Sequence, residues 1–472
     1  MTTAPTPPGT SLTPFLLLAS GTLAAGIGNG IAIVALPWLV LERIGSATSA
    51  ALVAAAASVP LLFASLISGT VVDLVGRRRI SIVSDALSGL SVIAIPLIDL
   101  TFGLTVVTLA ALAGLGSAFD PAGITARETM IPEAAARSGL GLDRANSIYE
   151  AIFNGAYLIG PGVGGVLIAV VGAVDTLWFT GLGFVVSMAA IGGVRLAGAG
   201  RPVDREQTGG FWRSTAEGLT FVWRERLLRT MTLLSMVVIG LYLPIEGVLL
   251  PVWFTERETP AQLGWVLMAM SIGGLLGALA YGQWGGRLRR RTIYVGSTIL
   301  LGATVLGLAL LPPIAVMLAI SLVLGLSYGP LGPITNYVMQ TRTPERLRGR
   351  VVGVVTSTTY AAGPAGFLLA GPLIDGLGIR PAFLLLAGAM MLVVLGTAFI
   401  PSLRQLDDPL STLGAGDATD ASGPPRADDH AGLPAGRIAS LYPTMPLNHP
   451  VPTPESTETR RTDRQRSATD AH

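Results

Sequence analysis

The sequence contains no cysteine and no lysine, and its three histidines stand at positions 430, 449 and 472, near the carboxyl end. Without cysteine, disulfides, thiolate metal sites and cysteine nucleophiles are excluded. Without lysine, the chain cannot complete a G-x-x-x-x-G-K-[ST] phosphate loop, which argues against direct drive by ATP. We therefore expect no enzyme activity, no metal site and no cofactor.

Charged residues are also scarce, at 13% of the chain, whereas hydrophobic residues make up 51% and the mean hydropathy is +0.62. Soluble domains carry about 25% charged residues. Apolar blocks fill the chain from residue 14 to residue 402, and each is long enough to cross a bilayer core of about 30 Å as a helix. The blocks lack the alternation of barrel strands, so they are predicted to be helices.

The predicted fold class is therefore an all-α polytopic membrane protein with 12 transmembrane helices in two six-helix halves. The expected spans are 14–41, 47–72, 79–99, 103–126, 145–171, 175–196, 229–254, 262–284, 292–312, 314–338, 350–376 and 380–402. Arginines gather in every second connection between these spans, for example at 77–79 and 287–291. By the positive-inside rule these connections are cytoplasmic, as are both termini of this multi-pass cell-membrane protein. No basic stripe with interleaved aromatics indicates a nucleic-acid partner.

An internal repeat supports two halves, because the Gly160-Pro161 pair of the fifth span has a counterpart, Gly363-Pro364, in the eleventh. Gly-Pro pairs are common in membrane helices, so a single pair would be weak evidence. The predicted organisation is a disordered cytoplasmic N-terminus, two halves, a central cytoplasmic loop with an amphipathic helix, and a disordered cytoplasmic tail. The corresponding ranges are 1–13, 14–196, 197–228, 229–402 and 403–472.

A charged motif follows the second span, in which Gly69, Asp73, Gly76, Arg77 and Arg78 have the spacing G-x-x-x-D-x-x-G-R-R. A carboxylate at a helix end can pair with an arginine four residues on, or face the positive N-terminus of a neighbouring helix. Such a cluster can hold one end of the protein closed and release it. The alternative is a topological anchor with an incidental aspartate.

This motif closely resembles motif A of the major facilitator superfamily, and the resemblance extends through the spans, the repeat and the central loop. It implies that Asp73 stabilises the outward-open form by contacting the N-terminal end of span 11, with Arg77 and Arg78 as loop partners. The second-half copy, within 282–291, has no acidic residue. Any latch formed by the second-half copy must therefore use a group other than a carboxylate.

The fifth span carries Gly160, Pro161, Gly164 and Gly165, where proline bends the helix and glycines permit close packing. This segment resembles motif C, the antiporter motif of drug/proton exporters, and so implies efflux. A structural kink without directional meaning is the alternative. Segments 120–147, 217–219 and 347–351 look like the branch that contains the enterobactin exporter and macrolide efflux proteins.

Three carboxylates within the expected spans are candidates for proton coupling: Glu246, which is the deepest, Glu150 and Asp85. Ionisable groups in a membrane are costly and are functional candidates by default, and desolvation favours the neutral carboxyl. For Glu150 and Asp85 the alternative is an interfacial carboxylate paired with a nearby arginine. For Glu246 a structural role is as plausible.

Polar and aromatic residues in the spans are candidates for a substrate pocket, because such pockets are mostly apolar with a few placed polar groups. The candidates are Asn29, Asn154, Tyr157, Tyr242, Tyr328 and Asn336. Each has a structural alternative, as a helix-to-helix hydrogen bond or an interface anchor. We expect no arginine deep in the spans, which favours neutral or cationic cargo.

Together these features predict a secondary active transporter that exports small amphipathic molecules, either drugs or siderophore-like metabolites, by proton-coupled alternating access. The expected partners are the substrate, protons and the lipid bilayer, and the expected state is a monomer. Two alternatives remain open: proton-coupled uptake of a small metabolite, and a receptor or scaffold that does not transport.

Overall fold

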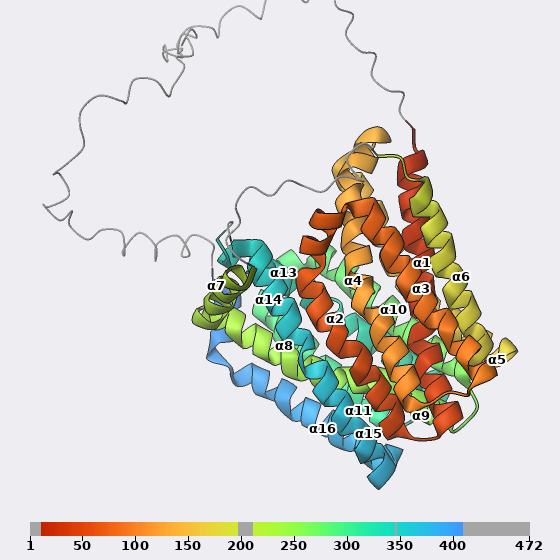
Figure 1. Cartoon of the computed structure of the whole chain (residues 1–472). Coiled ribbons are helices and arrows are strands. Elements are labelled where there is room, and N and C mark those ends of the chain that lie inside the picture. The colour runs from red at the N-terminus through yellow and green to blue at the C-terminus, as the bar shows by residue number, and fades with distance from the viewer. Residues whose placement is uncertain (1–10, 197–210, 345–346, 409–472) are drawn as a thin grey trace, which may run out of the picture. The chain divides into compact units, whose positions relative to one another are not determined.

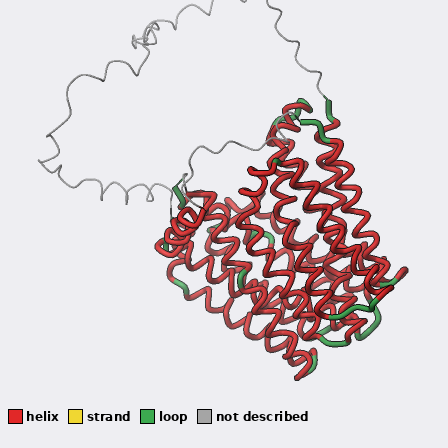
Figure 2. The backbone as a smooth tube through the Cα atoms, viewed as in Figure 1, coloured by secondary structure: helices red, strands yellow, loops and turns green. Residues whose placement is uncertain are grey.

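The computed structural model describes residues 11–196, 211–344 and 347–408. Within these ranges all regular structure is helical, and no strand occurs (Figure 2). Twelve helical stretches among the described residues are long and apolar enough to cross a membrane. The predicted fold class is therefore confirmed.

The first half consists of six single helices, and a glycine with positive φ stands at each of the five junctions between them. These glycines are Gly45 (72°), Gly76 (101°), Gly103 (76°), Gly139 (66°) and Gly172 (89°), in backbone conformations that residues with a side chain rarely adopt. The helices are α1 (Thr13–Ile44), α2 (Ala47–Val75), α3 (Arg77–Thr101), α4 (Val106–Arg137), α5 (Leu142–Val171) and α6 (Ala173–Gly193).

The second half follows the amphipathic linker helix α7 (Phe211–Arg224), and three of its spans are composite. In the span over 226–255, a π-helical turn after Pro244 interrupts the helix. In the span over 314–342, Gly329 and Pro330 separate two helices, and in the span over 350–377, Ala361 separates two helices. Proline removes a backbone donor, and π-turns are frequent at functional sites. The helices are α8 (Arg226–Pro244), η1 (Ile245–Leu249), α9 (Leu250–Thr255), α10 (Pro260–Trp284), η2 (Gly285–Arg287), α11 (Arg290–Ala309), α12 (Ile314–Tyr328), α13 (Leu331–Arg342), α14 (Arg348–Tyr360), α15 (Ala362–Leu377), α16 (Ile379–Gly396), η4 (Thr397–Phe399) and η5 (Pro401–Asp407).

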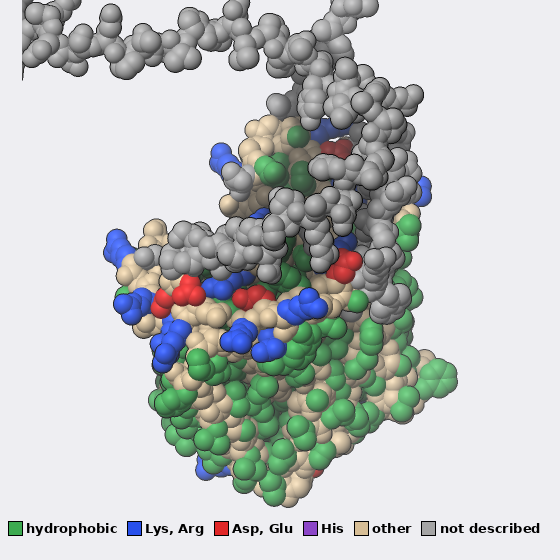
Figure 3. All heavy atoms as spheres, turned by 90° about the vertical axis from the view of Figure 1, so that its left-hand side faces the viewer, with side chains coloured by type: hydrophobic (Ala, Val, Ile, Leu, Met, Phe, Trp, Pro, Cys, Tyr) green, Lys and Arg blue, Asp and Glu red, His purple; other side chains and the backbone are tan. Residues whose placement is uncertain are grey.

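Charge is segregated along the helices. Figure 3 shows basic and acidic side chains gathered at one end of the visible face, with a surface of mostly hydrophobic side chains beyond them. We call this the arginine-rich end. Large apolar side chains remain exposed along the spans, such as Leu182, Leu279 and Leu369. An exposed apolar belt of this kind suits contact with lipid chains.

Helix α4 is longer than the sequence predicted. The fourth span was expected to end near residue 126, with a loop up to about residue 144, but the helix continues to Arg137 and contains both Pro121 and Pro132. Prolines are tolerated in membrane helices when neighbouring helices satisfy the freed backbone groups. Arg127, assigned to a loop from its charge, therefore lies inside a helix.

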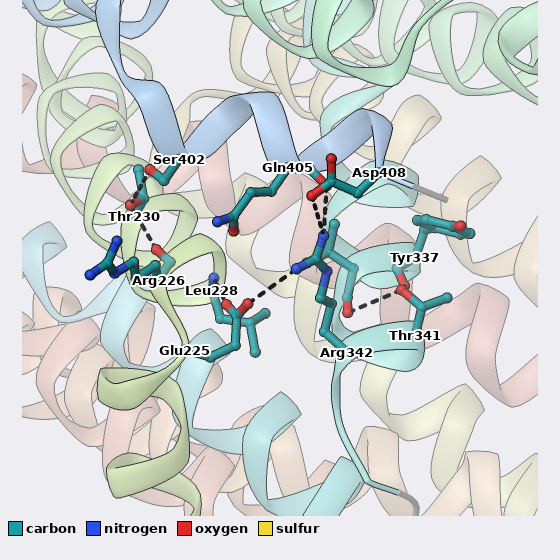
Figure 4. Close-up of polar contacts among 11 residues, drawn as sticks. Glu225, Arg226, Leu228, Thr230, Tyr337, Thr341, Arg342, Ser402, Gln405 and Asp408 are labelled. Carbon is teal, nitrogen blue, oxygen red and sulfur yellow. Dashed lines mark hydrogen bonds and ion pairs between the residues drawn. The ribbon is translucent and has the colours of Figure 1, made fainter. Parts of the chain in front are cut away.

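The folded part also extends beyond residue 402, into the range predicted to be disordered. Leu403 and Leu406 of η5 are buried. Figure 4 shows how Arg342 of α13 holds this segment: it pairs with Glu225 at 3.5 Å and donates to the Gln405 carbonyl at 2.6 Å. Asp408 lies 3.7 Å from the same guanidinium. The remainder of the tail, residues 1–10 and residues 197–210 lie outside the described residues.

The two halves meet mainly through two helix pairs. Helix α2 packs against α15, and α5 packs against α10 (Figure 1). The closest approaches join the start of α2 to the end of α15, and the last turns of α5 to the first turns of α10. These helix ends lie opposite the arginine-rich end. At the arginine-rich end, Glu217 of α7 pairs with Arg350 of α14, so two segments that resembled the exporter branch contact each other.

Candidate functional site

A cavity of about 790 Å³ lies between the helices of the two halves. This volume falls in the range of about 300–1,000 Å³ that is common for small-molecule sites. Helices α1 to α6 supply most of its wall, which is largely apolar. The second half contributes Leu243, Glu246, Gly247, Tyr360 and Phe367.

Two carboxylates face this cavity from opposite halves. Asp120 belongs to α4 and accepts a hydrogen bond from the Ser88 hydroxyl at 2.9 Å, while Glu246 belongs to the π-turn η1. No ion pair found among the described residues includes either group. A partly buried carboxylate without a cation is costly in an apolar wall. A proton or a cationic ligand would remove that cost.

A second cavity, of about 270 Å³, lies inside the second half and shares a wall with the first. Glu246 and Tyr360 border both cavities. Tyr242 and Tyr328 line the smaller one, with their rings stacked at 6.1 Å between centroids and 15° between planes. The Tyr242 hydroxyl points to the Met270 sulfur at 3.8 Å. Glu246 thus lies in the wall between the large cavity and a small tyrosine-lined chamber.

A separate polar cluster is buried in the first half. Arg127 of α4 donates to both carboxylate oxygens of Asp85, at 2.8 and 3.0 Å, and Ser187 of α6 donates to the same carboxylate at 2.7 Å. Arg127 is 5% exposed and Asp85 2%. The expectation that no arginine lies deep in the spans is therefore wrong. Asp85 matches the alternative weighed for it, a carboxylate paired with an arginine, and it does not line the cavity.

The predicted site residues divide between the cavities and the outside. Asn29 and Tyr157 line the large cavity, and Tyr242 and Tyr328 line the small one. Three others are exposed and belong to the lining of neither cavity: Glu150, Asn154 and Asn336. The Asn154 amide donates to the Glu150 carbonyl one helical turn earlier, at 2.9 Å.

The motif after α2 forms a tight turn in which Gly76 separates α2 from α3. Arg77 donates to the Thr129 carbonyl of α4 at 3.1 Å, and Arg78 donates to the Ile191 and Gly192 carbonyls of α6. Both arginines therefore join helices of the first half at the arginine-rich end. The surroundings of Gly69 and of the Asp73 side chain lie outside the described residues, so the latch role of Asp73 stays a prediction.

The Gly-Pro motif of α5 lies at a junction of three helices. A Cβ atom at Gly160 would lie 2.6 Å from the Gly30 Cα of α1, and one at Gly164 would lie 3.0 Å from the Ile31 Cα. On the other face, a Cβ at Gly165 would lie 2.5 Å from the Pro260 carbonyl oxygen of α10. The motif thus permits contact within the first half and between the halves.

The substitution Gly165→Ala tests this junction. Its methyl group would overlap the Pro260 carbonyl, and overpacking of this size costs about 1–3 kcal/mol, so we expect transport to fall about 10-fold. The matched control is Gly155→Ala on the same helix, where nothing lies within 4 Å of the added atom. Initial rates of transport in membrane vesicles, normalised to folded protein, give the comparison. Equal rates for the two variants would contradict the importance of close packing between α5 and α10 at Gly165.

Comparison with known families agrees with this architecture. Residues 8–413 match the family model described as transmembrane secretion effector, within the major facilitator superfamily. The chain belongs to this family.

Similar members of the secretion effector family are known by name. The chain is 51% identical over 397 residues to the multidrug efflux pump Tap of Mycolicibacterium fortuitum, covering 84% of this chain and 97% of that protein. It is 49% identical to Tap of Mycobacterium tuberculosis, over 84% of this chain and 95% of the relative. Macrolide efflux protein A of Streptococcus pyogenes is more distant, at 22% identity over 83% of this chain and 97% of that protein.

Solved structures show the same fold. The nucleoside transporter NupG superimposes with a TM-score of 0.67 at 12% identity, covering 82% of this chain and 98% of that one. A D-xylose-proton symporter superimposes with a TM-score of 0.62 at 12% identity, covering 84% and 99%. At this identity only the fold is shared. The predicted superfamily and its exporter-like branch are confirmed by the family match and the efflux relatives.

Sequence reasoning missed three residues of this secretion effector protein: Asp120 and Tyr360 in the cavity wall, and the buried position of Arg127. One signal was present. Asp120 and Arg127 are seven residues apart, so on a continuous α4 they lie on one face. The expected end of the span near residue 126 separated Asp120 from Arg127 and concealed that relation.

Proposed function

We propose that this protein exports small amphipathic molecules that carry a positive charge from the cytoplasm, in exchange for protons. The observation that supports this most directly is the large apolar cavity with two carboxylates in its wall, neither of which pairs with an arginine in the described part of the chain. An apolar wall suits the body of an amphipathic molecule. The carboxylates suit its positive charge.

Direction is supported by orientation and by relatives. By the positive-inside rule the arginine-rich end is cytoplasmic, and the tight contacts between the halves lie at the opposite end. The cavity is then closed toward the outside, and a cytoplasmic substrate can enter it. The Tap relatives are multidrug efflux pumps, which fits this geometry.

Proton coupling is supported by the same carboxylates. A proton and an organic cation both neutralise a carboxylate in an apolar wall, so they compete for Asp120 and Glu246. Release of the cation to the outside then favours proton uptake there, and release of the proton inside favours binding of the next cation. Asp120 and Glu246 are the groups we assign to this exchange. Glu150, being exposed and away from both cavities, is not assigned to it.

The test is ethidium uptake into inverted membrane vesicles that contain the protein. We expect uptake that requires an imposed proton gradient, with the vesicle interior acidic, and that stops when an uncoupler is added. Vesicles without the protein are the control. Uptake no faster than in these vesicles, with folded protein present, would refute cation export. Uptake that persists with the uncoupler would refute proton coupling alone.

A further inference from the structure

The spacing of the motif after α2 recurs at the other end of the molecule. Gly371, Asp375 and Gly378 repeat the pattern G-x-x-x-D-x-x-G, at the end of α15. The final glycines of the two copies have similar backbone angles, with φ 101° and ψ 138° at Gly76, and φ 84° and ψ 164° at Gly378. Each copy therefore ends a spanning helix with the same kind of turn.

Asp375 caps the first turn of α2, the helix whose far end carries the first copy. Its carboxylate accepts hydrogen bonds from the Ala47 and Thr48 amides and from the Ser46 hydroxyl, each at 3.0 Å. The first amides of a helix have no partner within the helix, and the helix dipole favours negative charge there. The cap is unusual because the acid comes from the other half of the protein.

Gly371, one turn before Asp375, permits this contact. A Cβ atom there would lie 2.7 Å from the Thr48 Cα and 2.8 Å from the Ala51 Cβ. The absence of a side chain lets α15 approach α2 closely enough for the carboxylate to reach the amides. In Figure 1, α2 and α15 run together toward the end opposite the linker helix α7.

We propose that Asp375 is a second latch, which holds the extracytoplasmic end closed while the cavity is open to the cytoplasm. The first copy, on α2, would act at the cytoplasmic end on the N-terminus of α14, the helix that precedes α15 in the same span. Both latches then join the same two spans, at opposite ends. In this scheme Asp375 caps the first turn of α2, and Asp73 would cap the first turn of α14.

The two latches oppose each other. An exporter that alternates its access opens one end only when the other is closed, so the Asp375 contact and the Asp73 contact belong to different states. Loss of Asp375 weakens the cytoplasm-open state, and loss of Asp73 weakens the opposite state. Asp375 is therefore a positioning residue for the cycle proposed above. Because its readout is a distance rather than transport, it can fail independently of the proposed substrate and coupling.

The test uses spin labels on introduced cysteines, since the natural chain has none. Phe102→Cys with Leu310→Cys reports the extracytoplasmic end, and Ala136→Cys with Leu288→Cys reports the arginine-rich end. All four positions are exposed. Distance distributions are measured by double electron–electron resonance in nanodiscs, with and without Asp375→Ala.

We expect Asp375→Ala to lower the population ratio of cytoplasm-open to outward-open protein about 2- to 30-fold, as for the loss of a helix N-cap. The first pair should move apart while the second pair comes together. Asp73→Asn should do the opposite, and the double variant should return toward the parent ratio. A purely structural role for Asp375 would not move the distant pair.

The matched control is Asp99→Asn, an acid at the same end whose partner, Arg43, belongs to the same half at 2.6 Å. It should leave both distributions unchanged. Ser46→Ala, which removes one donor to Asp375 and also the acceptor of the Ser49 amide while keeping the acid, should shift the ratio in the same direction as Asp375→Ala but less. If Asp375→Ala folds poorly, the distance distributions of Ser46→Ala show whether the contact stabilises the cytoplasm-open state. Unchanged distributions, or the same shift in Asp99→Asn, would overturn the proposal.

Discussion

The substitution Arg127→Ala should lower the free energy of unfolding by about 3–5 kcal/mol, because it leaves Asp85 charged and buried without a cationic partner. The two side chains are only 6% and 3% exposed, and Ser187 is the other residue seen to donate to the carboxylate. Neither group lines the cavity, so the loss should appear as instability and low yield rather than altered substrate preference.

The pair Asp85→Asn with Arg127→Met separates this charge effect from lost packing. Replacing both partners of a buried pair is often nearly neutral, so the double variant should be more stable than Arg127→Ala. The control is Arg43→Ala, which breaks a more exposed pair and should cost about 1 kcal/mol or less. Thermal unfolding followed by tryptophan fluorescence gives all four values. If Arg127→Ala is no less stable than Arg43→Ala, the buried ion pair does not have the stabilising role given to it here.

The positions of the spans could be predicted from the sequence because hydropathy is a local property. Each span must satisfy its own backbone bonds, so its length and composition define it without knowledge of its neighbours. Glu246 could be found in the same way, as a charge flanked by apolar residues on both sides. Tyr242 and Tyr328 could be named, but not their stacking, since that depends on how α8 and α12 pack.

The residues that were missed depend on contacts between distant segments. Arg127 looks like a loop arginine because a window of sequence counts its charge, whereas in the fold Asp85 of α3 neutralises it. Asp120 lies near the end of the expected fourth span, and its place in the cavity wall depends on how α4 packs. In the sequence, Asp375 resembles an ordinary acid at a helix end. In the fold, the start of α2, more than 300 residues earlier in the chain, lies against it. The motif spacing around Asp375 was visible, but its meaning required the packing of α15 on α2.

Removal of both cavity carboxylates, by Asp120→Asn with Glu246→Gln, should reduce ethidium transport more than 100-fold. A close pair of opposite charges in a desolvated site contributes about 2–5 kcal/mol to binding, which corresponds to about 30- to 4,000-fold in affinity. Each single variant should lose about 10- to 100-fold, because the other carboxylate still faces the same cavity. The amides keep the shape and the hydrogen-bonding capacity of the acids, so packing should change little.

Two controls make this result specific. Glu150→Gln removes an exposed carboxylate that lines neither cavity, and it should transport ethidium within about 2-fold of the parent, the range expected for a surface change.

An uncharged amphipathic dye should still bind the double variant, as measured by fluorescence titration of purified protein, because the apolar wall is intact. If the double variant loses the neutral dye as well, the carboxylates maintain the cavity rather than select charge. If it keeps ethidium transport, the cation is recognised elsewhere. Loss of ethidium with retention of the neutral dye is the pattern that a charge-selective exporter requires.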